Sequence, residues 1–167
     1  MGKIVMTRNE RMQKIESYGK GYVQLTEALK QFPEEMWSFK PSPDRWSIHE
    51  IIIHIADSEA NAYIKCRKLI AEPGKSIAAY DQDKWSASFR YQDQSTEEAL
   101  ELFRRLRLAS YKLIKALPEP VWLNSAGSME NETVTLDDWL EVYAQHIPGH
   151  INQMKKRYDE WRKKYLE

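Results

Sequence analysis

The chain has 167 residues, 42% of them hydrophobic and 30% charged, which is enough for one domain with a hydrophobic core and too apolar for a disordered chain. Its 25 basic residues balance its 25 acidic ones, and this zero net charge argues against a general nucleic-acid or membrane-surface binder. The single cysteine excludes an internal disulfide, and no stretch approaches the roughly 18 apolar residues of a membrane span; we therefore expect one domain over residues 1–167 of a cytoplasmic protein.

The first expected helix runs from about Glu10 to Gln31, and Pro33 ends it. Apolar side chains recur there in steps of three and four, which is typical of an amphipathic helix that packs against partner helices. They are Ile15, Tyr18, Tyr22, Leu25, Leu29 and Phe32.

A second helix is expected to begin at Ser47, because Ser47 and Glu50 have the spacing of a capping box. Its apolar face continues through Cys66 to Ile70, and Pro73-Gly74 ends it. The loop that follows, from about residue 72 to 94, is unusually long for a compact domain, and such loops are often functional.

The third helix is expected from Ser95, again with a Glu three residues later, to just before Pro118. A second long loop contains the sequence SAGSMENET, and the fourth helix starts at Thr135. No segment alternates strongly enough to predict a strand. Four amphipathic helices predict an all-α fold, a four-helix bundle with long connecting loops, and the 72–94 loop is long enough to let helices two and three run parallel.

Two histidines lie on the apolar face of the fourth helix, His146 and His150, four residues apart. At this spacing two imidazoles lie one above the other and can bind one metal ion. His54, on the inward side of the second helix, could supply a third ligand, leaving the fourth position open as in catalytic zinc sites. Core histidines with ordinary hydrogen-bond partners remain an equal alternative, since an H-x3-H pair is a weak motif.

Several other residues have a functional and a plain structural interpretation. Asp57 could orient a histidine ligand or reach the metal, although a solvated or salt-bridged acid is the simpler interpretation. Gln153 has a similar, weaker case. His49 points away from the inward face, Cys66 is expected in the core, and the basic residues around Arg157 are interpreted as a solvated face. The 72–94 loop could bring Asp81, Asp83 and Trp85 to a pocket rim.

Two stretches of the sequence resemble a known family. The segment WSIHEIIIHIADSE at residues 46–59 resembles the second helix of the DinB-like/YfiT-like superfamily, and HIPGHINQ at residues 146–153 resembles its fourth helix. The lead-in KPSPDRW at residues 40–46 is similar as well. The likeness covers nearly the whole chain in element order, is specific at these stretches, and is weak in the third helix and both long loops.

This resemblance implies a bundle of up-down-down-up topology with one divalent metal on His54, His146 and His150. Zinc or nickel is expected ahead of iron or manganese. The resemblance also implies a homodimer and a metal-dependent enzyme acting on a small molecule, either a hydrolase or an S-transferase that uses a low-molecular-weight thiol such as bacillithiol, mycothiol or glutathione. A non-catalytic metal- or ligand-binding protein of the stress response is the alternative, and a purely structural helical dimer is a third.

Overall fold

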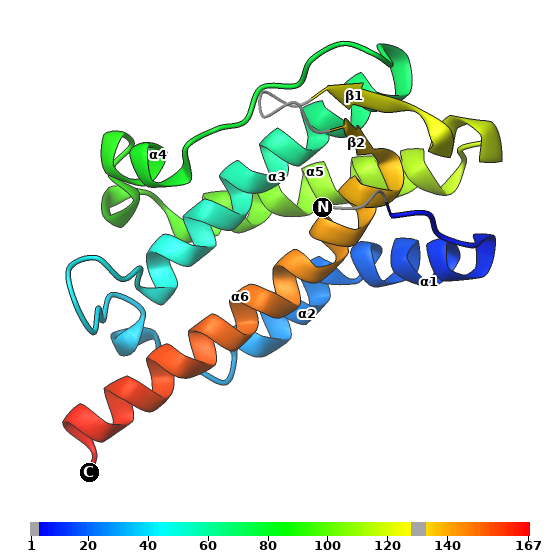
Figure 1. Ribbon diagram of the computed structural model, residues 1–167. Helices are drawn as coiled ribbons and strands as arrows, with labels where there is room; N and C mark the ends of the chain where they lie inside the picture. The colour runs from blue at the N-terminus through cyan, green and yellow to red at the C-terminus, as the bar shows by residue number, and fades with distance from the viewer. Residues whose placement is uncertain (1–3, 128–132) are drawn as a thin grey trace.

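Four long helical segments pack side by side in the structure, a computed structural model that describes residues 4–127 and 133–167 (Figure 1). The first segment is divided into two helices, and each of the other three is a single helix. The segments are α1 (Arg8–Gly19) with α2 (Gly21–Leu29), α3 (Ile48–Ala71), α5 (Thr96–Lys115) and α6 (Leu136–Tyr165).

The order of helix directions is up-down-down-up, as expected. Figure 1 shows α1, α2 and α6 running one way and α3 and α5 running the other way. The connection from α3 to α5 travels back along the bundle, which lets two consecutive long helices run parallel. The predicted all-α four-helix bundle is therefore confirmed.

The helix starts follow the predicted caps. The Ser47 hydroxyl accepts from the backbone N–H of Glu50 at 3.2 Å, and the Glu50 carboxylate accepts from the N–H of Ser47 at 2.9 Å. The same reciprocal pair opens α6 at Thr135. At Ser95 only the hydroxyl contact to the helix backbone is present. These side chains satisfy backbone donors that the first turn leaves without partners, which fixes where each helix begins.

The first predicted helix is wrong in one respect, because it is interrupted at Lys20 between α1 and α2. A Cβ atom on Gly19 would lie 2.7 Å from the Tyr111 ring, and one on Gly21 would lie 3.0 Å from the Arg107 guanidinium. Gly19 therefore needs to be glycine so that the backbone can approach Tyr111 of α5, and Gly21 is tightly packed against Arg107 and Ile147. The apolar period continues across the break, which is why the pattern predicts a single helix.

Both long loops contain short elements that the sequence pattern did not predict. The first holds helix α4 (Gln82–Ser88) and a 3₁₀ turn at Tyr91–Asp93, and further 3₁₀ turns lie at Glu34–Met36 and Glu119–Leu123. The expectation of no strand is wrong: β1 (Ser125–Gly127) pairs with β2 (Thr133–Thr135) in an antiparallel ladder with Ser125 opposite Thr135. Three residues are too few for alternation to be visible. Residues 128–132 of the SAGSMENET segment lie outside the described residues.

The core consists of two apolar clusters, one toward each end of the bundle. One gathers around Ile51, Phe103 and Ile147, and the other around Cys66, Leu140 and Trp139. The predicted core position of Cys66 is confirmed, since it is fully buried. In the described part of the chain, no helix combines the length and apolarity needed to cross a membrane.

Candidate metal centre

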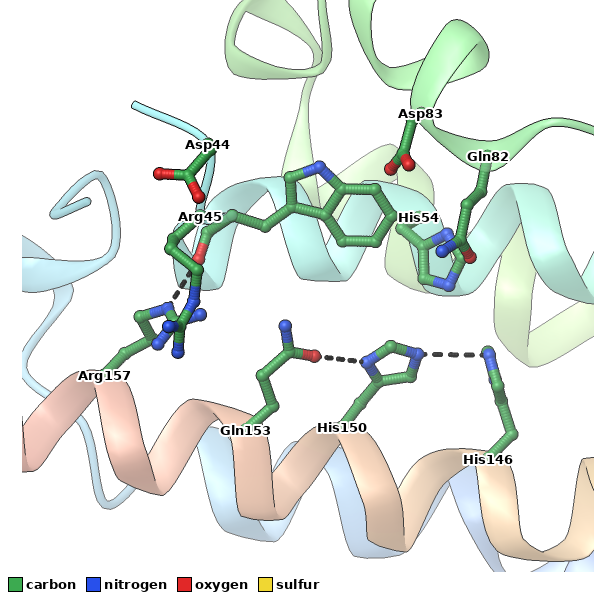
Figure 2. Close-up of a pocket in the computed structure, with 10 residues that line it drawn as sticks. Asp44, Arg45, His54, Gln82, Asp83, His146, His150, Gln153 and Arg157 are labelled. Atoms are coloured by element: carbon green, nitrogen blue, oxygen red, sulfur yellow. Dashed lines mark hydrogen bonds between the residues drawn. The ribbon is translucent and has the colours of Figure 1, made fainter. Parts of the chain in front are cut away.

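Three histidines converge between α3 and α6, and Figure 2 shows their rings facing a common space. His54 lies in the second turn of α3, and His146 and His150 lie one turn apart on α6. One nitrogen from each ring lies within 4.8 Å of the other two. The fold therefore brings together the three residues that the sequence suggested as ligands.

The spacing of the nitrogens fits a shared metal ion. His146 Nε2 and His150 Nε2 are 3.1 Å apart. With metal–nitrogen bonds of about 2.0–2.1 Å, two imidazoles on one ion have nitrogens about 2.9 Å apart at a right angle and about 3.3 Å apart at a tetrahedral angle. The observed separation lies between these values, so His146 and His150 are spaced to share one small ion, whereas His54 is placed only within the 4.8 Å limit of the cluster.

Gln153 holds one of these rings in the orientation that a metal needs. Its side-chain oxygen lies 2.9 Å from His150 Nδ1. Because an amide oxygen only accepts, the proton is on Nδ1 and the lone pair is on Nε2, which faces His146. The suggestion that Gln153 orients a histidine is supported by this contact, which resembles those that fix ligand tautomers in metal sites.

Burial keeps all three imidazoles neutral. It lowers the pKa of His54 to about 3, with a smaller contribution from the nearby His150. The pKa of His146 falls to about 2, chiefly through burial and then through charge repulsion from His150. Burial also lowers the pKa of His150, and the hydrogen bond that His150 donates to the Gln153 oxygen acts in the opposite direction. Neutral imidazole is the form that binds metal.

Two ring nitrogens of the cluster are buried without a hydrogen-bond partner, and His49 Nε2, outside the cluster, shares this property. His54 Nδ1 and His146 Nδ1 make no hydrogen bond to any residue that the structure describes. A buried polar atom without a partner costs about 1–3 kcal/mol, so core histidines are normally fully satisfied.

The histidines open into a cavity of about 370 Å³, a size suited to a small molecule. Trp46 forms one wall, with its ring centroid 4.6 Å from that of His54. Figure 2 shows Gln82 and Asp83 of α4 approaching from the side opposite α6. The remaining lining residues are Asp44, Arg45, Gln153 and Arg157.

The structure separates the other candidates. Asp57 does not reach the histidines: its carboxylate accepts a 2.6 Å hydrogen bond from the Tyr91 hydroxyl. Asp83 lines the cavity as suggested, whereas Asp81 caps α4 by accepting from the Lys84 backbone N–H. Trp85 lies outside the cavity lining and packs on Tyr80.

His49, on the first turn of α3, lies outside the histidine cluster, in agreement with its predicted direction.

Arg157 corrects the sequence interpretation most clearly. It was interpreted as part of the solvated basic face of the fourth helix, but its side chain is only 1% exposed. Its Nε donates to the Trp46 carbonyl at 2.7 Å and its Nη1 pairs with Glu160 at 2.9 Å. The spacing offered a signal, because Arg157 follows His150 by two helical turns and therefore shares its face.

The sequence pattern also does not predict the burial of a second arginine. Arg107 of α5 pairs with Glu59 of α3 at 2.6 Å, and both side chains are almost completely buried. The same guanidinium donates to the carbonyls of Tyr18 and Tyr143, so it links α1, α3, α5 and α6 just below the histidines. No local motif marks such a pair, since its partners come from different helices.

Comparison with known proteins places these features in context. The family model for the DinB superfamily matches residues 20–154. A candidate metal-dependent hydrolase of Oceanobacillus iheyensis is 27% identical over 117 residues, covering 68% of this chain and 67% of that protein. YfiT of Bacillus subtilis, also named as a candidate metal-dependent hydrolase, is 25% identical over 107 residues, covering 64% of this chain and 60% of YfiT.

Solved structures show the same fold. The solved structure of YfiT, described as having an unusual four-helix bundle topology, superposes with a TM-score of 0.85 at 19% identity, covering 94% of this chain and 90% of YfiT. A mycothiol-dependent maleylpyruvate isomerase superposes with a TM-score of 0.68 at 9% identity, covering 86% of this chain and 60% of the isomerase. At these identities the likeness concerns the fold alone.

Proposed function

The chain belongs to the DinB superfamily, and from that premise we propose that it is a metal-dependent enzyme acting on a small molecule. His54, His146 and His150 would hold one divalent cation, with zinc or nickel expected ahead of iron or manganese. The observation that carries the proposal is the convergence of three neutral imidazoles at one end of a cavity, with ligand nitrogens within 4.8 Å of one another.

Two reactions fit this arrangement: hydrolysis, or transfer to a low-molecular-weight thiol. A divalent cation on three imidazoles supplies Lewis acidity, which activates either a water or a thiol as the nucleophile. The protein contributes a fixed direction for one ligand, through the hydrogen bond that His150 Nδ1 donates to Gln153, and a cavity wall formed by Trp46. Names of relatives favour hydrolysis.

The non-catalytic alternative requires a closed coordination sphere. Among the described residues, no carboxylate or thiol joins the three histidines within 4.8 Å, and the nearby Asp57 is held by Tyr91. Three protein ligands beside a cavity leave room for an exchangeable ligand, which is the pattern of catalytic sites rather than structural ones. This favours an enzyme over a storage or structural metal protein.

The test is turnover by the full chain loaded with zinc or nickel. One panel offers esters and amides, and the other offers an electrophile together with bacillithiol, mycothiol or glutathione. We expect metal-dependent turnover in one panel, lost in His54→Ala and kept in His49→Ala, a matched histidine on the same helix that lies outside the cluster. A metal-loaded protein that is inert in both panels would argue for the non-catalytic alternative.

We further propose that the chain forms a single domain over residues 1–167, is cytoplasmic and assembles as a homodimer. The homodimer is what the resemblance to the DinB-like family implies. Light scattering coupled to size-exclusion chromatography measures the mass directly. A monomeric mass at micromolar concentration would contradict the dimer.

A further inference from the structure

Two arginines lie at the end of the cavity that is farther from His146 (Figure 2). Arg157 follows His150 by seven residues on α6, which places it about 10.5 Å farther along the helix axis. Arg45 comes from the loop before α3, and the carbonyl of its neighbour Trp46 accepts the 2.7 Å hydrogen bond from Arg157 Nε. The two guanidinium groups therefore belong to one end of one cavity.

Arg157 is fixed in place by one hydrogen bond to the Trp46 carbonyl and one ion pair with Glu160. Its side chain is 1% exposed, while its ion-pair partner Glu160 is 39% exposed, on the outer side of the helix. Its Nη2 makes no hydrogen bond to any residue in the described ranges. Because burying a charge is costly unless it is fully paired, a guanidinium with a spare donor beside a cavity is suited to an anionic ligand.

Arg45 has no ion-pair partner within residues 4–127 and 133–167. The acid next to it, Asp44, accepts a 2.5 Å hydrogen bond from the Ser42 hydroxyl, and this bond, more than the charge of Arg45, lowers the pKa of Asp44. The other acid of the cavity, Asp83, comes from α4 on the opposite wall. Asp44 and Glu160 balance the charges of Arg45 and Arg157 at this end, so what it offers a planar oxyanion is guanidinium N–H groups that are not used by other described residues and can form paired hydrogen bonds.

We propose that Arg45 and Arg157 form a subsite for an oxyanion group, a carboxylate or a phosphate, of the small molecule that this cavity binds. The substrate would carry that group about two helical turns from the atom that reacts at the histidines. The placement of the reacting atom at the histidines rests on the proposed function, whereas the oxyanion subsite itself needs no metal.

The first test uses the metal-free full chain and isothermal titration calorimetry with glutarate and with glycerol phosphate. We expect millimolar or tighter binding of at least one probe, and the tighter one identifies carboxylate or phosphate. Arg45→Gln should weaken it at least tenfold, whereas Arg8→Gln, which removes an 80% exposed arginine on α1, should leave it unchanged. Failure of both probes to bind, or equal binding by Arg45→Gln, would overturn the proposal.

The second test uses nickel-loaded protein and two thiols of equal length, 6-mercaptohexanoate and 6-mercapto-1-hexanol. The carboxylate, 6-mercaptohexanoate, should bind at least tenfold tighter than 6-mercapto-1-hexanol. The shorter carboxylate 3-mercaptopropionate should show a smaller advantage over the alcohol, because it is too short to reach the arginines. Arg45→Gln should remove the preference for the carboxylate without changing nickel content or affinity for the alcohol. Arg157→Lys, which keeps the buried charge, should reduce the preference for the carboxylate. If nickel fails to bind, the proposed function fails, and the metal-free titration still decides the oxyanion subsite.

Discussion

Replacing Arg107 with methionine should destabilise the bundle strongly. Arg107 is 2% exposed and its partner Glu59 is completely buried, with 2.6 Å between Nη2 and Oε2. Methionine fills similar space but leaves the Glu59 carboxylate without its cation, and breaking a buried pair from one side costs about 3–5 kcal/mol. Total stability of a domain is about 5–15 kcal/mol, so this loss is a large share of it.

Urea denaturation of the metal-free protein, followed by circular dichroism at 222 nm, measures the loss. We expect Arg107→Met to lower the free energy of unfolding by about 3–5 kcal/mol and the melting temperature by about 6–20 °C. Adding Glu59→Gln removes the unpaired charge and keeps an acceptor for the Tyr18 hydroxyl, which donates to Glu59. The double variant should therefore recover at least 1 kcal/mol relative to the single one.

Two results would refute this reasoning. A loss below about 1 kcal/mol in Arg107→Met would mean that the pair contributes no more than an exposed ion pair does. A double variant less stable than Arg107→Met would mean that the cost comes from lost packing rather than from an unpaired buried charge. The packing alternative is reasonable to test, since Arg107 also lies over the Tyr18 ring at 3.9 Å.

Three smaller perturbations give further tests. Gly19→Ala should lower the free energy of unfolding, measured by urea denaturation, by at least 1 kcal/mol, because the new Cβ would lie 2.7 Å from Tyr111. Gly149→Ala meets nothing within 4 Å and should raise the free energy of unfolding by about 0.5–1 kcal/mol. Burial raises the pKa of Cys66 to about 12, so iodoacetamide at pH 8 should not label the native thiol; rapid labelling without denaturant would contradict its burial. Gln153→Ala should weaken zinc affinity about 10–100-fold in a competition titration; unchanged affinity would deny it an orienting role.

The sequence predicted the features that depend on local pattern. Ser47 and Thr135 mark helix starts because capping needs only residues three apart, and the histidine pair on α6 follows from a four-residue spacing. His54 could be assigned to the same site because it lies on the inward side of a facing helix. The caps and the histidine pair need no knowledge of how the helices are arranged, whereas the assignment of His54 depends on the helix arrangement that the family resemblance implies.

Most features that the sequence missed depend on contacts between distant segments. Arg107 and Arg157 look like surface arginines until the bundle is assembled, since their carboxylate and carbonyl partners come mostly from other elements. The break at Lys20 follows from the approach of two glycines to α5, which no periodicity reveals. The strand pair of Ser125–Gly127 with Thr133–Thr135 is local, and it was missed because strands of three residues are too short to give an alternating pattern.

The measurement that tests the central claim most directly is elemental analysis of untagged protein after incubation with zinc, nickel, iron or manganese. We expect near-stoichiometric metal in the parent and in His49→Ala. Metal should be lost in folded His146→Ala and His150→Ala, whose ring nitrogens are 3.1 Å apart in the parent. No metal under any loading condition, or equal metal in all variants, would contradict the three-histidine centre and leave a helical bundle with histidines in its core.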